Sequence, residues 1–222
     1  MRTKIIATYG PSSKNLIPEL LKAGASIIRL NTKYISPRQV QNIIQRHPKT
    51  SFMLDIKDRN LLQKISHLKF KYLAISFAES EKEIIQIKEM FPKQIIISKI
   101  ENQKGVDNIN KLIKVSDGIM IARGDLGKSI QFQKVPMIQK SITKKCNKAK
   151  IFSITATEMM PSMISYVRPS RAETADIANA ILEGSEALML SEETAIGKYP
   201  VLAIKMMKTI ILETEKHIKE FK

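Results

Sequence analysis

The sequence predicts an α/β fold, a (β/α)8 barrel of the TIM type that occupies residues 1–222 as a single domain. Three observations lead to this prediction. Eight short apolar runs recur along the chain, amphipathic segments separate them, and polar residues gather where the runs end. Near-continuous apolar character is typical of parallel strands that are covered on both faces. Eight such strands in a chain of 222 residues match a barrel near the short end of its size range, with a doubly wound open sheet as the alternative.

The expected strands share a short apolar stretch bounded by polar or turn-forming residues. In chain order they are 4–10, 26–31, 51–57, 71–77, 94–100, 117–123, 151–157 and 186–191. Between them, apolar residues at three- and four-residue spacing predict helices at 80–91, 106–115, 135–149 and 170–184. Ser80 is a start signal for the first of these helices, and Gly184 is a stop signal for the last.

Composition narrows the classes of function. No apolar run approaches the roughly 20 residues of a membrane helix, and the N-terminus has no signal-peptide layout. A single cysteine, Cys146, fits a reducing cytoplasm, which is the expected location. The net charge of +16 raises nucleic-acid binding as an alternative, whose mark is weak, steeply salt-dependent affinity. Because the basic residues are scattered and only 5% of residues are aromatic, we read most of the charge as a solvated face.

A barrel of this kind places its chemistry at the carboxyl ends of the strands. The polar residues at those ends are Arg29, Asn31, Asp55, Lys57, Lys99, Glu101, Asp125, Thr157, Ser191, Glu192 and Glu193, and the opposite ends carry no comparable cluster. Lys99 and Glu101 are two residues apart in one strand, so they point to the same side of the sheet.

The residue types at these ends favour a magnesium enzyme acting on a small anion. Glu101 and Asp125 follow neighbouring strands, and two carboxylates without His or Cys suit a hard cation such as Mg²⁺. An ammonium beside that metal, Lys99, stabilises charge that develops on an enolate or a phosphoryl group.

Other residues at the same ends are suited to hold the substrate. Gly124 lets the backbone approach a ligand just before an expected helix, where free N–H groups bind anions. Thr157 offers a hydroxyl donor, and Arg29 offers a planar fork for phosphate or carboxylate. Taken singly, each residue is better explained by a structural role, such as a rim salt bridge or a plain turn. Their occurrence together at one end of the barrel favours the enzyme.

Seven segments resemble the barrel domain of pyruvate kinase, in order and over nearly the whole chain. They are "RTKIIATYGPSS", "AGASIIRLN", "ISKIENQKGVDNINKLIKVSDGIMIARGDLG", "VPMIQKSITKKCNKA", "ITATEMMPSMI", "RPSRAETADIANAILEG" and "ALMLSEETAIGKYP". The resemblance implies an enzyme that transfers a phosphoryl group between phosphoenolpyruvate and ADP, giving pyruvate and ATP.

The resemblance also assigns roles to residues of this sequence. Lys99 matches the catalytic lysine, and Glu101 and Asp125 match the Mg²⁺ ligands. Gly124, Asp125 and Thr157 match the group that binds the substrate carboxylate, and Thr157 also matches the residue linked to proton delivery at the enolate carbon. The remaining matches are Arg29 at the phosphate, Asn31 and Asp55 at the K⁺ site, Thr8 and Pro11 near the nucleotide, and Ser191 and Glu193 at the pocket floor.

The departures from the family fall mainly on the nucleotide and K⁺ sites. Only residues 58–70 stand where the family inserts a lid domain, and the family's C-terminal regulatory domain does not follow the eighth helix. The family's "DTKGPEIR" reads "DIKDRNLL", so Ile56 replaces a K⁺-site threonine and Leu62 falls where an ATP-contacting arginine belongs. "LSGETA" reads "LSEETA" and "TATQM" reads "TATEM".

The family's "NFSHG" reads "NTKYI", which puts Lys33 in place of a serine that helps hold K⁺. The ammonium of Lys33 either replaces the charge of K⁺ or belongs to a solvent-facing loop. A requirement for K⁺ is therefore in question.

Several functions stay open on the sequence alone. The first is a minimal pyruvate kinase, alone or as a homo-oligomer, with any lid supplied by another chain. The second is nucleotide-free enolate chemistry, namely pyruvate enolisation or oxaloacetate decarboxylation. A third is a non-catalytic relative that binds phosphoenolpyruvate.

Overall fold

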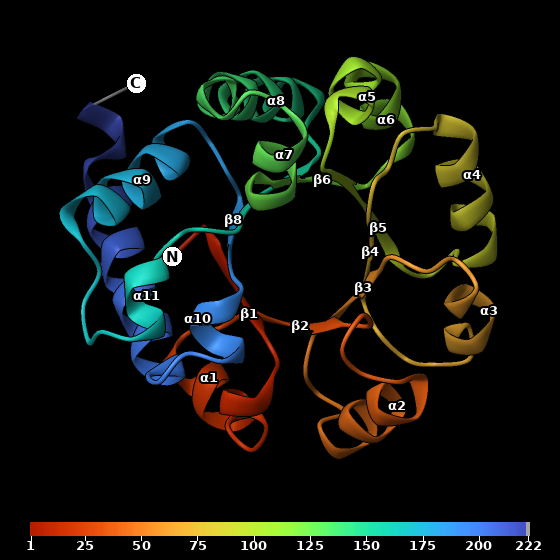
Figure 1. Cartoon of the computed structure of the whole chain (residues 1–222), viewed down its shortest axis with the longest axis horizontal. Coiled ribbons are helices and arrows are strands. Elements are labelled where there is room, and N and C mark those ends of the chain that lie inside the picture. The colour runs from red at the N-terminus through yellow and green to blue at the C-terminus, as the bar shows by residue number, and fades with distance from the viewer. Residues whose placement is uncertain (221–222) are drawn as a thin grey trace. The chain divides into compact units, whose positions relative to one another are not determined.

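A computed structural model describes residues 1–220 of the chain (Figure 1). Eight parallel strands form a closed barrel in chain order, so the barrel prediction is confirmed over the open sheet. The strands are β1 (Lys4–Thr8), β2 (Ile27–Asn31), β3 (Phe52–Ile56), β4 (Tyr72–Ile75), β5 (Ile95–Ile100), β6 (Gly118–Ala122), β7 (Phe152–Ala156) and β8 (Ala187–Leu190).

Helices follow the strands along the chain. They are α1 (Ile17–Ala23), α2 (Pro37–Arg46), α3 (Leu61–Ile65), α4 (Glu81–Met90), α5 (Gln103–Asp107), α6 (Ile109–Val115), α7 (Arg123–Ser129), α8 (Val135–Ala149), α9 (Arg171–Leu182), α10 (Glu192–Ala195) and α11 (Pro200–His217). Short 3-10 turns occur at Pro11–Ser13, Phe132–Lys134, Pro161–Ile164 and Ile218–Glu220. Within residues 1–220, no helix has the length and apolar character needed to span a membrane.

Two helices differ from the prediction. The segment 106–115 holds the end of α5 and the whole of α6, which Asn108 separates. Helix α5 begins earlier than expected, where Asn102 caps it by accepting a hydrogen bond from the amide of Gly105 at 2.9 Å. Gly124 was expected to precede a helix, but α7 begins one residue earlier, at Arg123. Gly124 therefore lies in the first turn of α7. Ser80 does occupy the position before α4, although its side chain makes no capping hydrogen bond there.

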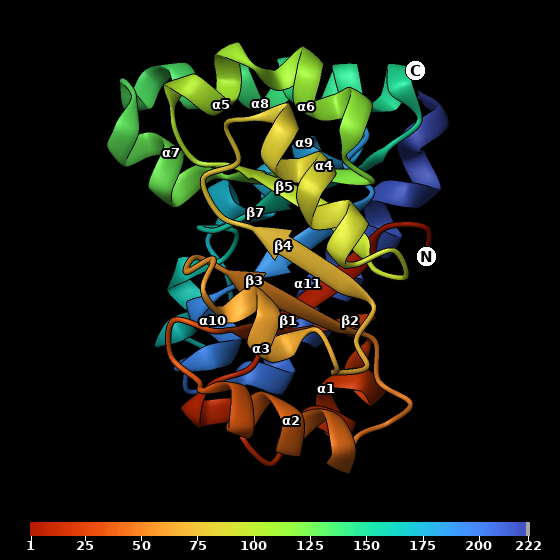
Figure 2. The same ribbon diagram turned by 90° about the vertical axis from the view of Figure 1, so that its right-hand side faces the viewer.

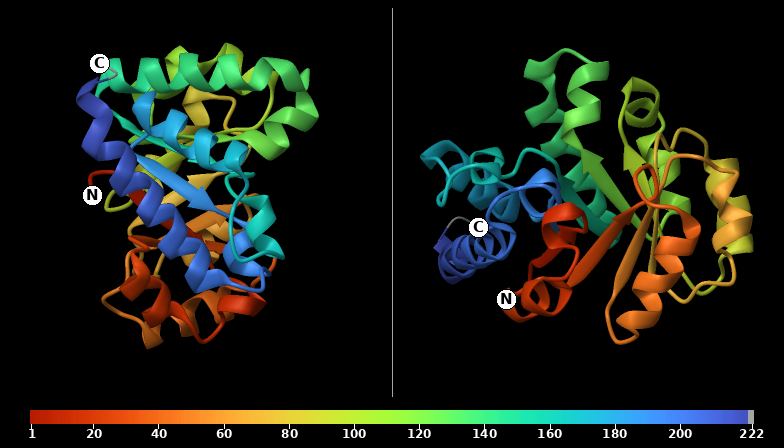
Figure 3. Two further views of the ribbon diagram at one scale, coloured as in Figure 1. Left: turned by 90° about the vertical axis from the view of Figure 1, so that its left-hand side faces the viewer. Right: turned by 60° about the horizontal axis from the view of Figure 1, so that its bottom comes forward.

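The chain divides into two compact units, which we describe separately. Unit 1 comprises Met1–Ile28 and the chain from Ser153 onward. In unit 1, β8 pairs in parallel with both β1 and β7. The long helix α11 packs beside α9, as Figure 3 shows, and it also contacts α1. The core of unit 1 is built from aliphatic side chains of the strands and of α11, such as Ile5, Leu188 and Met207, which are buried.

Unit 2 comprises Arg29–Phe152. In it, β3, β4, β5 and β6 pair successively in parallel. Helix α4 contacts β5 and α6, and Figure 2 shows it lying over the outer face of β4 and β5. The core between helices and strands includes Phe52, Ile96 and Leu112, all essentially inaccessible to solvent.

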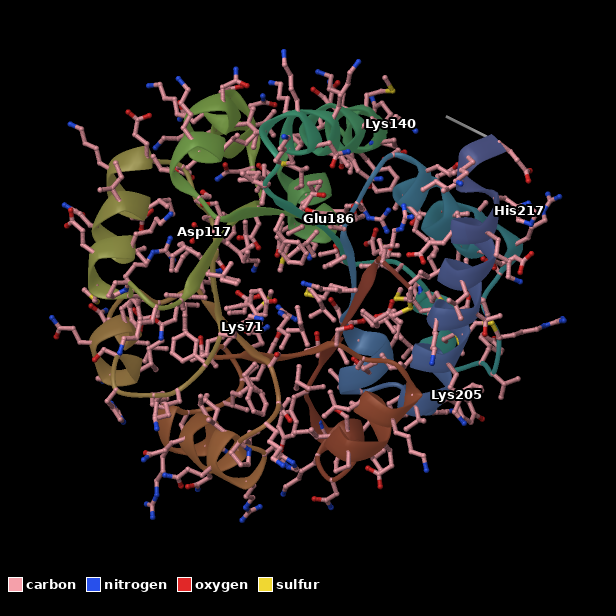
Figure 4. All side chains as sticks on the ribbon, turned by 180° about the vertical axis from the view of Figure 1, so that it is seen from behind. Lys71, Asp117, Lys140, Glu186, Lys205 and His217 are labelled. Atoms are coloured by element: carbon pink, nitrogen blue, oxygen red, sulfur yellow. The ribbon has the colours of Figure 1, made fainter. Side chains whose placement is uncertain are left out.

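Carboxylates just before the amino ends of two strands accept hydrogen bonds from backbone amides of neighbouring strands. In unit 2, Asp117 precedes β6 and accepts the amide of Ile96 at 2.8 Å and the Lys88 ammonium at 2.7 Å (Figure 4). In unit 1, Glu186 precedes β8 and accepts the amide of Ser153 at 3.3 Å. These carboxylates help to hold neighbouring strands in register. The side chains of Asp117 and Lys88 are each about one-third exposed.

Candidate active site

Strand register brings the carboxyl ends of β3, β4 and β5 together in unit 2. Asp55 pairs with Ala74, and Ala74 pairs with Ile97. Because alternate residues of a strand face the same side, Ser76 and Lys99 lie one step further along that side. Lys99 and Glu101 were expected to leave the sheet side by side, and their Nζ and Oε1 atoms are 3.0 Å apart.

The Lys99 ammonium is surrounded by three oxygen acceptors. Nζ lies 3.0 Å from Asp55 Oδ1, 2.9 Å from Ser76 Oγ and 3.0 Å from Glu101 Oε1. An ammonium has three N–H donors, so these contacts use its full capacity. Lys99 is only 5% exposed. Its charge is thus held in a site of low dielectric, between two carboxylates.

Asp55 is the centre of this network. Its Oδ2 accepts hydrogen bonds from Arg29 Nε at 2.8 Å and Arg29 Nη2 at 2.7 Å, while its Oδ1 accepts from Lys99 and from the Ser76 hydroxyl at 3.2 Å. Burial acts to raise the pKa of Asp55, but the charges of Lys99 and Arg29 outweigh it and hold that pKa at about 2. Asp55 is therefore an anion at any physiological pH.

At Glu101, the effect of burial on the pKa exceeds that of the neighbouring positive charge, the reverse of Asp55. Its Oε2 accepts the amide of Phe77 at 2.6 Å, and Phe77 has a left-handed backbone with φ of 50°. Burial raises the pKa of Glu101 and outweighs the nearby Lys99 ammonium. The two carboxylates that share Lys99 therefore differ, since Asp55 holds its negative charge more firmly than Glu101.

Glu101 and Asp125, the residues expected to bind Mg²⁺, follow β5 and β6. Asp125 lies in the first turn of α7, next to Gly124, with its side chain half exposed and Oδ1 3.9 Å from Lys128 Nζ. Among residues 1–220, no three His, Cys, Asp or Glu side chains gather as a metal cage. A pair such as Glu101 and Asp125 suits Mg²⁺, which keeps several waters and completes its shell with substrate oxygens.

The residues expected at a K⁺ site do not fit that ion. Both oxygens of Asp55 are engaged by the cationic side chains of Arg29 and Lys99, and Ile56, fully buried, offers no oxygen from its side chain. Asn31 Oδ1 accepts the backbone amide of Lys33 at 3.1 Å. The Lys33 side chain is exposed, with Nζ 5.2 Å from the centre of the Tyr34 ring. This placement favours the solvent-facing interpretation of Lys33.

In unit 1, the expected site residues lie around the ends of β7 and β8. Thr157 and Glu158, with φ of 70° and 53°, form a left-handed turn directly after β7. The buried carboxylate of Glu193 accepts the amides of Met160 at 3.0 Å and Ser191 at 2.7 Å, and so ties this turn to the end of β8. Burial raises the pKa of Glu193 despite these amides. The Ser191 hydroxyl is buried without a hydrogen-bond partner among the described residues.

The two residues expected near a nucleotide, Thr8 and Pro11, lie at the end of β1 in unit 1. The Thr8 hydroxyl donates to the carbonyl of Leu190 at 2.8 Å, and the Thr8 amide donates to Thr194 Oγ1 at 2.9 Å. Pro11 is exposed and begins a 3-10 turn. Thr8 is 5% exposed, so its contacts tie β1 to β8.

Unit 2 thus brings together Arg29, Asp55, Lys99 and Glu101, and it adds two residues that sequence analysis missed, Ser76 and Phe77. The signal for Ser76 was present, because it follows Ala74 by two residues at the end of a strand and so faces the same side. The role of Phe77 rests on its backbone amide, which no side-chain pattern marks.

Comparison with known proteins identifies the family. The model of the pyruvate kinase barrel domain matches residues 52–204. Curated relatives include the pyruvate kinase of Borreliella burgdorferi, 47% identical over 73% of this chain and 35% of that protein. The pyruvate kinase of Methanocaldococcus jannaschii is 40% identical over 78% of this chain and 40% of its own length, and that of Chlamydia pneumoniae is 54% identical over 57% and 26%.

The chain spans about a third of the length of the curated relatives it matches, for example 35% of the Borreliella protein and 32% of the Clostridium acetobutylicum protein. The matched part contains the ends of β3, β5, β6, β7 and β8, and with them Asp55, Lys99, Glu101, Asp125 and Thr157. By its sequence and its closed barrel, the chain belongs to the pyruvate kinase barrel-domain family.

Proposed function

We propose that the chain transfers a phosphoryl group from phosphoenolpyruvate to ADP, giving pyruvate and ATP. The observation that carries this proposal is the buried Lys99 ammonium, held between Asp55 and Glu101 at 3.0 Å from each. Buried ion networks are costly to maintain. Carboxylates with shifted pKa values around a buried cation are typical of functional sites, and membership of the family supports this reaction class.

Lys99 supplies positive charge where the reaction creates negative charge. As the phosphoryl group leaves phosphoenolpyruvate, charge develops on the enolate oxygen, and a fixed ammonium in a site of low dielectric stabilises it. Since Lys99 already donates to three acceptors, it exchanges one of them for the substrate oxygen. Glu101, with its raised pKa, is the weaker of the two carboxylate partners and is the one exchanged.

The neighbouring residues bind and orient the substrate. Arg29 presents a planar guanidinium to the phosphate. In unit 2, Gly124 and Asp125 in the first turn of α7 bind the substrate carboxylate. In unit 1, we assign Thr157 to carboxylate binding and to proton delivery at the enolate carbon. Ser191 and Glu193, also in unit 1, are the residues that we assign to the floor of the substrate site. Glu101 and Asp125 would hold Mg²⁺, which when bound supplies Lewis-acid stabilisation of the same developing charge.

We propose that the reaction needs no K⁺. At Asp55 the positive charge comes from Arg29 and Lys99, and this holds whether or not Lys33 contributes. Activity is expected to be the same in potassium and in tetramethylammonium buffers. Strict dependence on K⁺ would contradict this, and K⁺ dependence appearing only in Lys33→Ser would instead assign the replacement to Lys33.

The test of the proposed function is the rate of pyruvate formation from phosphoenolpyruvate and Mg²⁺, measured with and without ADP. We expect ADP-dependent pyruvate in the natural chain and a loss of at least about a hundredfold in Lys99→Met. Lys114→Met is the matched control, because Lys114 is exposed on α6. Pyruvate formed at equal rates by Lys99→Met and the natural chain would overturn the proposal.

A second candidate is enolate chemistry without a nucleotide, namely pyruvate enolisation or oxaloacetate decarboxylation. The contacts of Thr8 favour it, because its hydroxyl is already bonded to the Leu190 carbonyl. Leu62, at the position where the family carries a nucleotide-contacting arginine, is apolar and buried. This candidate predicts no ADP-dependent pyruvate, but Mg²⁺-dependent exchange of pyruvate methyl protons with solvent.

A further inference from the structure

One peptide unit in unit 2, between Ser76 and Phe77, is held at both of its polar atoms. The Ser76 carbonyl accepts a hydrogen bond from Arg59 Nη2 at 2.7 Å. The Phe77 amide, in the same peptide plane, donates to Glu101 Oε2 at 2.6 Å. The orientation of this peptide therefore decides whether an N–H or a carbonyl faces Glu101.

That orientation is not the one the backbone prefers. Phe77 has φ of 50°, in the left-handed region where a bulky side chain is strained. Such a conformation costs of the order of 1–3 kcal/mol and persists only where surrounding contacts enforce it. A rotation of the 76–77 peptide relieves the strain, but it also turns the N–H away from Glu101.

The Arg59 guanidinium donates hydrogen bonds to three further acceptors besides the Ser76 carbonyl. Its Nη1 lies 3.3 Å from the Ile56 carbonyl and 3.2 Å from the Lys57 carbonyl, and its Nε lies 2.6 Å from Glu83 Oε1 on α4. The guanidinium thus joins the end of β3, the end of β4 and α4. Its planar fork allows these bonds to form together.

The Ser76 side chain links the same peptide to Lys99. Ser76 Oγ accepts from Lys99 Nζ at 2.9 Å and donates to Asp55 Oδ1 at 3.2 Å. A change in the backbone at Ser76 therefore reaches both Lys99 and Glu101. Arg59 itself touches neither of them through any of its four bonded groups.

We propose that Arg59 is a positioning residue, which locks the Ser76–Phe77 peptide so that the Phe77 amide holds Glu101 and the Ser76 hydroxyl holds Lys99. This rests on the proposed function, in which Lys99 and Glu101 do the chemistry. It assigns a role in that chemistry to the short β3–α3 connection, which contains Arg59. Without Arg59, the peptide turns and both side chains lose their fixed positions.

The direct test observes the Phe77 amide. Labelling with ¹³C-carbonyl serine and ¹⁵N-phenylalanine selects Ser–Phe pairs, and the sequence has two, at 51–52 and 76–77. In Arg59→Met, we expect solvent exchange of the Phe77 amide to rise at least about tenfold while the Phe52 amide stays unchanged. The Phe52 signal reports that the barrel is folded. Arg38→Met, at an exposed arginine of α2, is the matched control and should leave both signals unchanged.

Turnover provides the second readout. In Arg59→Met, kcat is expected to fall about ten- to a hundredfold with little change in KM for phosphoenolpyruvate. Arg59→Lys keeps the charge but replaces the planar fork by a single donor nitrogen, so it should restore part of kcat and part of the amide protection. A general loss of folding would instead raise the solvent exchange of the Phe77 and Phe52 amides together.

The two proposals fail in distinguishable ways. An unchanged Phe77 amide in folded Arg59→Met overturns the positioning role, whatever the activity. An unchanged kcat in that variant overturns it as well. Absence of turnover in the natural chain overturns the proposed function, while the amide measurement still decides whether Arg59 locks the peptide.

Discussion

The strand ends of the two units are built from different chemistry. In unit 2, the ends of β2, β3 and β5 gather four charged side chains, Arg29, Asp55, Lys99 and Glu101, each less than a tenth exposed and all bonded in one network. In unit 1, the ends of β1 and β8 hold threonine hydroxyls that bond mainly to backbone, and Glu193 binds two amides.

The polar side chains at the strand ends of unit 2 bind one another as ions, whereas those of unit 1 bind backbone amides and carbonyls. A buried ion network contributes little to the stability of a fold, because proteins in which apolar residues of similar volume replace it are often as stable or more stable. Hydroxyl and carboxylate contacts to backbone amides and carbonyls serve the fold itself. We therefore expect changes in the unit 2 network to affect activity and stability together. Changes to backbone contacts of unit 1 that lie outside the proposed substrate site, such as those of Glu215, should affect stability alone.

The largest expected effect comes from breaking the network at its centre. Asp55→Asn keeps the shape but leaves Arg29 and Lys99 buried without their shared anion. It should lower the free energy of unfolding in urea by about 3–5 kcal/mol and abolish activity. The control, Asp107→Asn, removes an exposed carboxylate of α5 and should cost less than about 0.5 kcal/mol. Equal effects of the two substitutions would show that the network does not carry this energy.

The next effect concerns pH. The pKa of Asp55 falls from 3.8 to about 2 on folding, so its contribution to stability is present above pH 4 and is lost as the pH falls through 2. The shift corresponds to about 2 kcal/mol. The difference in unfolding free energy between the natural chain and Asp55→Asn should therefore shrink by about that amount between pH 4 and pH 2. A constant difference over this range would contradict the charge assignment.

The smallest effect tests unit 1. Glu215 of α11 accepts the amides of Arg2 at 2.8 Å and Thr3 at 2.7 Å, and so anchors the start of the chain. Glu215→Ala should lower the free energy of unfolding by about 1–2 kcal/mol, because it leaves the Thr3 amide without its acceptor. Turnover at 25 °C should stay within about twofold of the natural chain. A larger loss of activity than of stability would break the contrast between the units.

Much of the fold could be predicted from the sequence, since local pattern determines it. The apolar run 94–100 contains β5, and the periodic segment 135–149 is α8 to the residue. The boundary between α5 and α6 was missed, because it lies at Asn108, whose side-chain amide donates to the Glu79 carbonyl at 3.0 Å, a contact that apolar spacing does not mark.

The candidate site residues could be predicted where two features identify them: the type of side chain, and the alternation of side chains between the two faces of a strand. Lys99, Glu101 and Asp55 lie at strand ends, and their pairing follows from register. Arg59 and Phe77 were beyond reach, because one acts on a backbone carbonyl and the other through a backbone amide. The pairing of Arg29 with Asp55 also needed the structure, which shows two cations sharing one carboxylate.

The central claim, that the buried Lys99 ammonium stabilises an enolate, is tested most directly by proton exchange at the methyl group of pyruvate. The measurement is the loss of the methyl signal in deuterium oxide with Mg²⁺, followed by NMR, and it needs no nucleotide. The account predicts exchange in the natural chain and in Lys114→Met, and a rate at least about a hundredfold lower in Lys99→Met. Exchange by Lys99→Met at the rate of the natural chain would contradict it.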